Sequence, residues 1–318
     1  MNRILRVLLA AMAVVGGVLA VDTAAGAGGL PPVDSYNEYF DSQAFQVTGD
    51  YVPIMGVNGC EKEEDLFILW YGPGTAPDHL WTIDSVEPLS WTSTPVTING
   101  TYEPLIGDFD GDYCDDIFWY GAGGAADHVW YNNGDSTFTS QTASVNGTYR
   151  PVVTNFDKGA DDILWYAPGS GAEYIWTGQA DRTFDSVAAP PVNGDYRTAA
   201  SNGTVLFHKP GPGQDYLWGQ FREGLSGPAT VIPIDINGSY TPLMGPLSIL
   251  LYGPGAAQDH AITGIDEDGT LTTTPASING DYTPALRSPA VTNLGFLWHA
   301  PGAAADYLWV VDGASSSG

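Results

Sequence analysis

The stretch WYGAGGAADHVW, residues 119–130, recurs in five further copies along the chain, and this repetition decides the fold. Each copy has an aromatic or aliphatic pair, a Gly- and Pro-rich turn, an acidic residue, His or Tyr, and in five copies a closing Trp. The other copies are WYGPGTAPDHLW from residue 70, WYAPGSGAEYIW from 165, FHKPGPGQDYLW from 207, LYGPGAAQDHAI from 251 and WHAPGAAADYLW from 298. Six copies predict one supersecondary unit repeated six times.

A second marker, Gly-x-Tyr, precedes every copy, with tyrosines at 51, 102, 149, 196, 240 and 282. Within the second unit, apolar runs separated by turn residues predict four strands over 102–106, 116–120, 127–131 and 137–145. Helical periodicity is absent, and 40 Gly and 23 Pro residues oppose helices. Units of about 40 to 50 residues with four strands are typical of propeller blades. We therefore predict an all-β, six-bladed β-propeller.

The two ends of the repeat region predict how the ring closes. The last unit stops after its third strand, 307–311, and has no fourth. The segment FDSQAFQVTG from residue 40 instead resembles FTSQTASVNG from residue 138, a fourth strand. We expect this N-terminal strand to complete the last blade, which removes exposed sheet edges. The propeller then spans 39–311, followed by a flexible tail, 312–318.

The first residues predict export. Arg3 and Arg6 precede an apolar run over 7–21, and Ala25-Gly26-Ala27 supplies a small-x-small cleavage pattern. We expect a signal peptide over 1–27 and a short leader segment over 28–38. An N-terminal membrane anchor is the alternative, but the apolar run is short for a full span. The mature protein is expected to be secreted, with no membrane span after cleavage.

The charge balance restricts the partners. The net charge is −27, with only 10 Lys and Arg residues against 37 Asp and Glu. No basic face can form to collect phosphates, so nucleic acid and anionic membranes are excluded as partners. We expect a monomer whose partner is an extracellular glycan or a cell-surface protein.

Two cysteines, Cys60 and Cys114, are present. An even count in an oxidising compartment favours a disulfide between them. Metal ligation is the alternative, but no histidine is near either cysteine in sequence. If they pair, the bridge joins equivalent loops of two neighbouring blades.

The most acidic loop lies in GDFDGDYCDDIFWYGAG, residues 107–123. Asp108, Asp110, Asp112 and Asp116 occupy positions 1, 3, 5 and 9, where alternating carboxylates can converge on calcium. This segment resembles an FG-GAP/VCBS repeat, the blade unit of integrin alpha-chain propellers. The resemblance implies structural calcium held by those four aspartates and the backbone carbonyl of Cys114.

The sequence departs from that family at position 6, where Tyr113 replaces the usual glycine. The third unit offers a loop one residue shorter, and the first unit offers Asn58 and Asp65. The alternative is an Asp/Gly turn held by side-chain to backbone hydrogen bonds. The third-unit residues are Asn155, Asp157, Asp161 and Asp162.

Repeat positions also account for the histidines and most tryptophans. His79, His128 and His260 share one slot with tyrosines, and His208 and His299 share another, so we expect hydrogen-bonded blade residues rather than catalysts. One tryptophan slot could form a ring of sugar-stacking platforms, but packing between blades is the favoured explanation. That slot holds Trp81, Trp130, Trp176, Trp218 and Trp309.

No catalytic motif stands out: Gly-x-Ser-x-Gly and His-Glu-x-x-His are both absent. The main expectation is a secreted, non-enzymatic binding or adhesion scaffold, with glycan as a candidate ligand. The first alternative is an extracellular carbohydrate-active enzyme, a polysaccharide lyase or a glycosidase on the same fold. The second is a purely structural cell-envelope protein.

Overall fold

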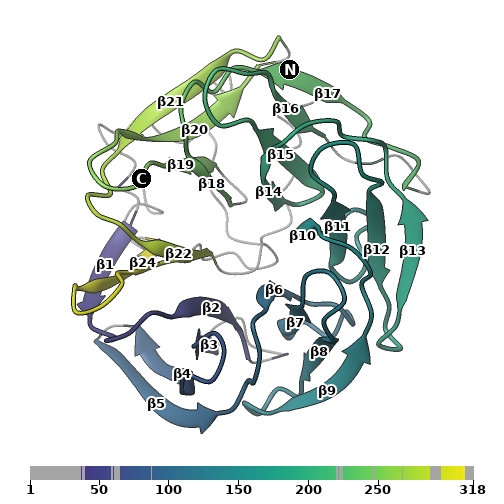
Figure 1. The fold of residues 1–318 in the computed structure, drawn as a ribbon. Helices are drawn as coiled ribbons and strands as arrows, with labels where there is room; N and C mark the ends of the chain where they lie inside the picture. Colours follow the sequence, from purple (N-terminus) through teal and green to yellow (C-terminus); the bar gives the residue numbers. More distant parts are fainter. Residues whose placement is uncertain are drawn as a thin grey trace, which may run out of the picture.

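The computed structural model describes residues 37, 40–58, 60, 65–86, 88–219, 221, 225–245, 248–266, 268–286 and 295–311. The expected signal peptide, the tail, and the leader segment apart from Asn37 lie outside these residues. Six four-stranded antiparallel sheets are arranged around a ring (Figure 1). The six-bladed all-β propeller is confirmed, and the described part of the chain contains no α-helix.

Five blades are built from consecutive strands, ordered from the axis outward. Blade 1 has β2 (Val52–Val57), β3 (Leu66–Tyr71), β4 (Asp78–Val86) and β5 (Leu89–Val96). Blade 2 has β6 (Glu103–Gly107), β7 (Asp116–Tyr120), β8 (Asp127–Asn132) and β9 (Phe138–Ala143). Blade 3 has β10 (Arg150–Thr154), β11 (Asp162–Tyr166), β12 (Tyr174–Gly178) and β13 (Phe184–Ala188). Blade 4 has β14 (Arg197–Ser201), β15 (Thr204–His208), β16 (Asp215–Trp218) and β17 (Val231–Ile234). Blade 5 has β18 (Thr241–Met244), β19 (Ile249–Tyr252), β20 (Asp259–Ile265) and β21 (Leu271–Ala276).

Blade 6 joins the two ends of the chain. Its own strands are β22 (Thr283–Leu286), β23 (Gly295–His299) and β24 (Asp306–Val311), and the outer strand is β1 (Phe40–Phe45). β1 runs antiparallel to β24, with Phe40 opposite Val311 and Phe45 opposite Asp306. Figure 1 shows this purple strand beside the yellow C-terminal strand. The expected closure by the N-terminal strand is confirmed.

The second strand of each blade is buried on both faces. All six residues of β3, LFILWY, are buried, because each blade packs between two others. Side chains alternate along a strand. Phe67, Leu69 and Tyr71 therefore pack toward blade 2, while Ile68 and Trp70 pack toward blade 6. The continuous apolar runs in the sequence reflect this two-sided burial.

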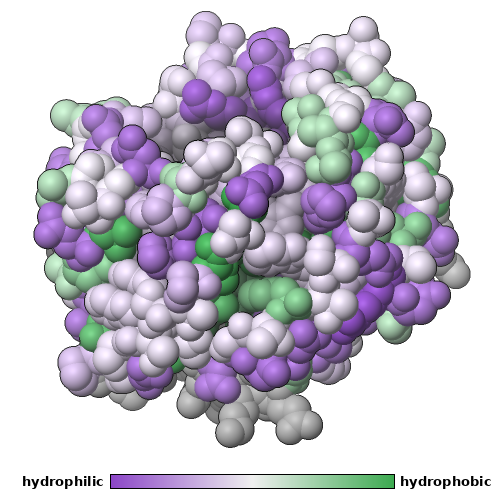
Figure 2. All heavy atoms as spheres, turned by 60° about the horizontal axis from the view of Figure 1, so that its bottom comes forward, coloured by the Kyte–Doolittle hydropathy of each residue, from purple (hydrophilic) through white to green (hydrophobic). Residues whose placement is uncertain are grey.

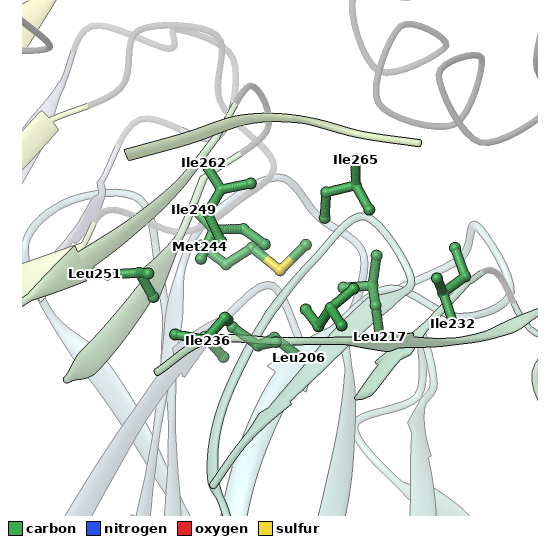
Figure 3. Packing of buried hydrophobic residues seen from close by; sticks show 11 residues of the cluster. Leu206, Leu217, Ile232, Ile236, Met244, Ile249, Leu251, Ile262 and Ile265 are labelled. Atoms are coloured by element: carbon green, nitrogen blue, oxygen red, sulfur yellow. The ribbon is translucent and has the colours of Figure 1, made fainter. Parts of the chain in front are cut away.

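Six hydrophobic clusters hold the ring together, one at each contact between neighbouring blades. Figure 3 shows the cluster between blades 4 and 5, where Leu206 and Leu217 face Met244 and Ile249. No cluster belongs to a single blade. The blades are therefore stabilised by one another rather than each by a core of its own.

The repeated acidic residue ties the ends of five blades; in blade 3 the two carboxylate oxygens of Glu173 are buried without a hydrogen-bond partner. In blade 1, the carboxylate of Asp78 accepts hydrogen bonds from the N–H of Gly72 at 2.8 Å and of Ile98 at 2.7 Å. Asp127, Asp215, Asp259 and Asp306 accept the corresponding pairs in other blades. These carboxylates are structural.

The surface carries few apolar groups. Figure 2 shows one face of the molecule, where hydrophilic and intermediate residues dominate and hydrophobic ones form only small patches. No helix among the described residues is long and apolar enough to cross a membrane.

Candidate functional site

The innermost strands begin at equivalent positions, and one of these positions breaks the repeat. The position that breaks the repeat is the residue that follows each Gly-x-Tyr marker. Innermost strands of neighbouring blades contact one another around the axis. Blades 1, 5 and 6 have Val52, Thr241 and Thr283 there, which carry no charge. Blades 2, 3 and 4 have Glu103, Arg150 and Arg197, all of them exposed. Three consecutive blades thus place charged side chains at one end of the innermost strands.

Arg150 is the centre of this charged group. Its Nη1 forms an ion pair with Asp195, which precedes the innermost strand of blade 4. The same Nη1 donates to the carbonyl of Tyr196 at 2.7 Å. The side chains of Arg150 and Asp195 are 45% and 75% exposed, so a ligand can reach both.

Glu103 lies on the other side of Arg150. Crowding by surrounding protein atoms raises the pKa of its carboxyl to about 7, because desolvation disfavours the charged form. The positive charge of Arg150 opposes this shift without cancelling it. Glu103 can therefore hold a proton near neutral pH, and Asp195 is ion-paired with Arg150. We call Glu103, Arg150 and Asp195 the axial triad.

The described acidic loop, 108–116, lies at the opposite end of the blade 2 inner strand. Carboxylate oxygens of Asp108, Asp110 and Asp116 lie within 4.8 Å of one another. Burial, together with smaller contributions from neighbouring aspartates, raises the pKa of Asp108 to about 6 and that of Asp116 to about 9. A cation among these carboxylates would offset that repulsion.

Most oxygens of this loop already accept hydrogen bonds. Asp108 accepts three backbone N–H groups, from Gly111, Asp112 and Tyr113, and Asp116 accepts those of Phe109 and Asn132. These bonds match the alternative expectation of an Asp/Gly turn.

Asp110 distinguishes the loop from a simple turn. Its side chain is 5% exposed, and its Oδ2 accepts from Nε of Arg182 at 2.8 Å. Its Oδ1 is buried without a hydrogen-bond partner. An unpartnered buried carboxylate oxygen next to two further carboxylates fits a hard cation such as calcium. Asp112 bonds instead to the N–H of Cys114.

The corresponding loop of blade 3 is held mostly by internal hydrogen bonds, although Oδ1 of Asp162 is also buried without a partner. Asn155 donates to the carbonyl of Gly159, Asp157 accepts from Gly159, and Asp162 accepts from the N–H of Phe156. Asp161 faces blade 2, where it accepts from the N–H of Asp108 at 3.0 Å. In blade 1, Asn58 bonds to Ser136 of blade 2.

The disulfide between Cys60 and Cys114 is confirmed, and it joins the loops of blades 1 and 2. Tyr113, beside it, has φ 69°, the left-handed conformation that a glycine adopts without strain. Its side chain is 79% exposed. The chain therefore makes the sharp turn at position 6 although no glycine is present.

The tryptophan slot lies between blades. Trp81, Trp218 and Trp309 are buried, and the other two are half-buried. Each contacts an aromatic ring on the second strand of its own blade, with centroid distances of 4.7 to 5.4 Å. Trp130 and Trp176 are the half-buried pair.

Two of these tryptophans also line cavities at equivalent places. A cavity of about 670 Å³ beside blade 4 is lined by Tyr196, Tyr216 and Trp218 among others. A cavity of about 320 Å³ beside blade 6 is lined by the repeat equivalents, Tyr282, Tyr307 and Trp309.

The histidines behave as blade residues, as expected. His208 and His299 are fully buried, and their Nδ1 atoms lie 2.9 and 2.8 Å from Asp215 and Asp306. In blade 1 the equivalent Tyr71 instead donates to the carbonyl of Gly100.

Sequence reasoning missed the axial triad and Arg197. The available signal was the residue after Gly-x-Tyr, where charge replaces Val or Thr in three consecutive units. This signal was passed over because the repeat gave no reason to place Glu103, Arg150 and Arg197 side by side.

Comparison with known proteins found neither a matching family model nor a matching curated protein. Solved structures do match. The *Penicillium chrysogenum* alpha-L-arabinanase is 12% identical over 84% of this chain and 98% of its own, with TM-score 0.53. The GH93 alpha-L-arabinofuranosidase of *Fusarium graminearum* is 10% identical over 89% and 96%, with TM-score 0.54. A luciferin-regenerating enzyme is 9% identical over 86% and 96%, with TM-score 0.52.

At these identities the matches establish a shared propeller fold. All three structures are described as enzymes, and two are named for arabinose-containing glycans. The main expectation of a non-enzymatic scaffold is therefore contradicted. That expectation rested on the absence of a catalytic motif and of a carboxylate pair that stands out in the sequence.

Proposed function

We propose that the protein is an exported carbohydrate-active enzyme that cleaves a glycosidic bond at the axial triad. The observation that carries this proposal is Arg150, which lies between a protonatable Glu103 and a salt-bridged Asp195. Glycoside hydrolysis needs two carboxyl groups in different protonation states. Glu103 supplies a protonatable carboxyl and Asp195 an ion-paired one. Glu103 and Arg150 depart from the repeat, whereas Asp195 occupies a position that is also Asp in units 1 and 6.

Glu103 would act as the general acid. Its proton passes to the glycosidic oxygen as the bond from that oxygen to the anomeric carbon breaks. Asp195 would serve the opposite side of the sugar, either taking a proton from the attacking water or attacking the anomeric carbon itself. Water supplies the hydroxyl group that completes the product. Arg150 fixes the position of the Asp195 carboxylate through their ion pair.

We also propose that the acidic loop holds a structural calcium ion, with Asp108, Asp110 and Asp116 as ligands. The support is the convergence of their oxygens and the unpartnered Oδ1 of Asp110. The ion would supply positive charge that stabilises the loop beside the disulfide. Export is supported by that disulfide, since such bonds persist in oxidising compartments.

The test is release of reducing sugar from a panel of neutral and acidic polysaccharides, arabinan and polygalacturonate among them. Glu103→Gln should lower kcat by about 100-fold or more, the usual contribution of a general acid. The matched control is Thr283→Ala, which changes the same repeat position in blade 6 and should keep the activity. Equal activity of the two variants, or no activity of the wild-type protein on any polysaccharide, would count against the proposal.

A further inference from the structure

Arg150 and Arg197 occupy the same repeat position in neighbouring blades and reach in the same direction. Nη1 of Arg150 donates to the carbonyl of Tyr196 in the next blade, and Nη1 of Arg197 donates to that of Tyr240. Each guanidinium therefore lies against the Gly-x-Tyr segment of the following blade. The two sites can be compared position by position.

The comparison shows one difference. The segment that Arg150 meets is Gly194-Asp195-Tyr196, and its middle residue provides the counter-ion. The segment that Arg197 meets has Ser239 in that place. Among the described residues, no carboxylate forms an ion pair with Arg197. Its exposed guanidinium has donors left over, because only its Nη1 is engaged.

An uncompensated arginine is unusual in this protein, whose net charge is −27. An anionic ligand would be repelled by most of the surface and attracted locally by the free donors of Arg197. Arginine binds a carboxylate through two parallel N–H···O bonds when its fork is free. The repeat equivalence shows where that carboxylate would lie, since Asp195 occupies the same place beside Arg150.

We infer that Arg197 binds the carboxylate of a uronic-acid residue, so that the substrate is an acidic polysaccharide. This inference rests on the proposed function, because it assigns the substrate class of the same site. The sugar carboxylate takes the role beside Arg197 that Asp195 takes beside Arg150. The adjacent triad then lies one blade away from the bound acidic sugar.

The inference is tested by binding rather than by turnover. Titration calorimetry in the Glu103→Gln background would compare oligogalacturonate with a neutral arabino-oligosaccharide of equal length. We expect tighter binding of the acidic ligand, weakening as salt increases. Arg197→Gln should weaken that binding about tenfold or more, a loss of about 1.4 kcal/mol or more, because hydrogen bonds to a charged group are lost. Its effect on the neutral ligand should be small.

Two further variants distinguish recognition of the sugar carboxylate by Arg197 from a general effect of positive charge on the protein. Lys158→Gln removes the same charge from the loop after β10, at the opposite end of that strand, and should leave binding unchanged. Ser239→Asp should give Arg197 the counter-ion that Arg150 has, and so weaken acidic binding while the arginine is kept. Circular dichroism would confirm that each variant is folded.

Several results would overturn the inference: equal binding of both ligands, no binding of either, or equal loss in Arg197→Gln and Lys158→Gln. Preference for a sulfated oligosaccharide over oligogalacturonate would overturn the assignment to uronic acid. Cleavage of neutral polysaccharides alone would refute the acidic substrate but would agree with the proposed glycosidic cleavage. Arg197-dependent binding without cleavage by the wild-type protein would instead refute the hydrolysis.

Discussion

Removing the disulfide should destabilise the propeller by an amount that follows from its position in the chain. Cys60 and Cys114 are 54 residues apart, and no other cysteines are present to exchange with them. In the chain-entropy description, a closed loop of that length lowers the unfolded-state entropy by roughly 14 cal/mol/K. The corresponding loss of unfolding free energy on opening the bond is about 4 kcal/mol at 25 °C.

The assay is equilibrium unfolding in urea, followed by the fluorescence of the buried tryptophans. The oxidised wild type, the reduced wild type and the double variant Cys60→Ala/Cys114→Ala would be compared. Both bridge-free forms should have unfolding free energies about 4 kcal/mol lower, and the double variant should not respond to reductant. A difference below about 1 kcal/mol would refute the reasoning, because it would mean that unfolding does not release this loop.

Three further predictions follow from the site and its loops. Since desolvation by surrounding protein atoms raises the pKa of Glu103 to about 7 and the general acid must be protonated, kcat/KM should fall as the pH rises through about 7; a profile flat from pH 5 to 9 would contradict this role. Tyr113→Gly should raise the unfolding free energy by about 0.5–1 kcal/mol, because relief of the left-handed strain exceeds the added freedom of the unfolded chain; a lower urea midpoint would show that the tyrosine contributes contacts worth more than its strain. Calcium at about 100 times its dissociation constant should add about 2.7 kcal/mol of stability, and Asp110→Asn should abolish the response; identical melting with calcium and with chelator would exclude the ion from this loop.

The sequence was most informative where a physical constraint repeats. The strand predicted over 116–120 corresponds to β7. Asp116 and the four apolar residues after it lie between two turns, and a run of that length between turns has few alternatives to a strand. Ring closure was predictable since the strand at residue 40 has no other partner in the repeat. The disulfide followed from two cysteines whose loops become neighbours once the blades are placed in order.

The site was harder to predict because its members are separated by whole blades. Glu103, Arg150 and Asp195 lie about 45 residues apart along the chain and meet only when innermost strands surround one axis. The only local signal is the charge that replaces Val or Thr after Gly-x-Tyr at Glu103 and Arg150, and each residue alone resembles an ordinary exposed charge. Arg182 gives a second example: it comes from a blade 3 loop, and its pairing with Asp110 in blade 2 has no signal in sequence.

The closing strand determines when the ring can be completed during synthesis. β1 is the first strand to be synthesised, and its partner β24 is the last, with Phe40 and Val311 about 270 residues apart. At roughly 5–20 residues per second, β1 remains unpaired for about 15 to 50 s during synthesis. Its hydrogen-bonding groups are open to other chains throughout that interval. The finished ring thus forms in one late step, and a chain held unfolded until it is complete avoids pairing β1 with the wrong partner.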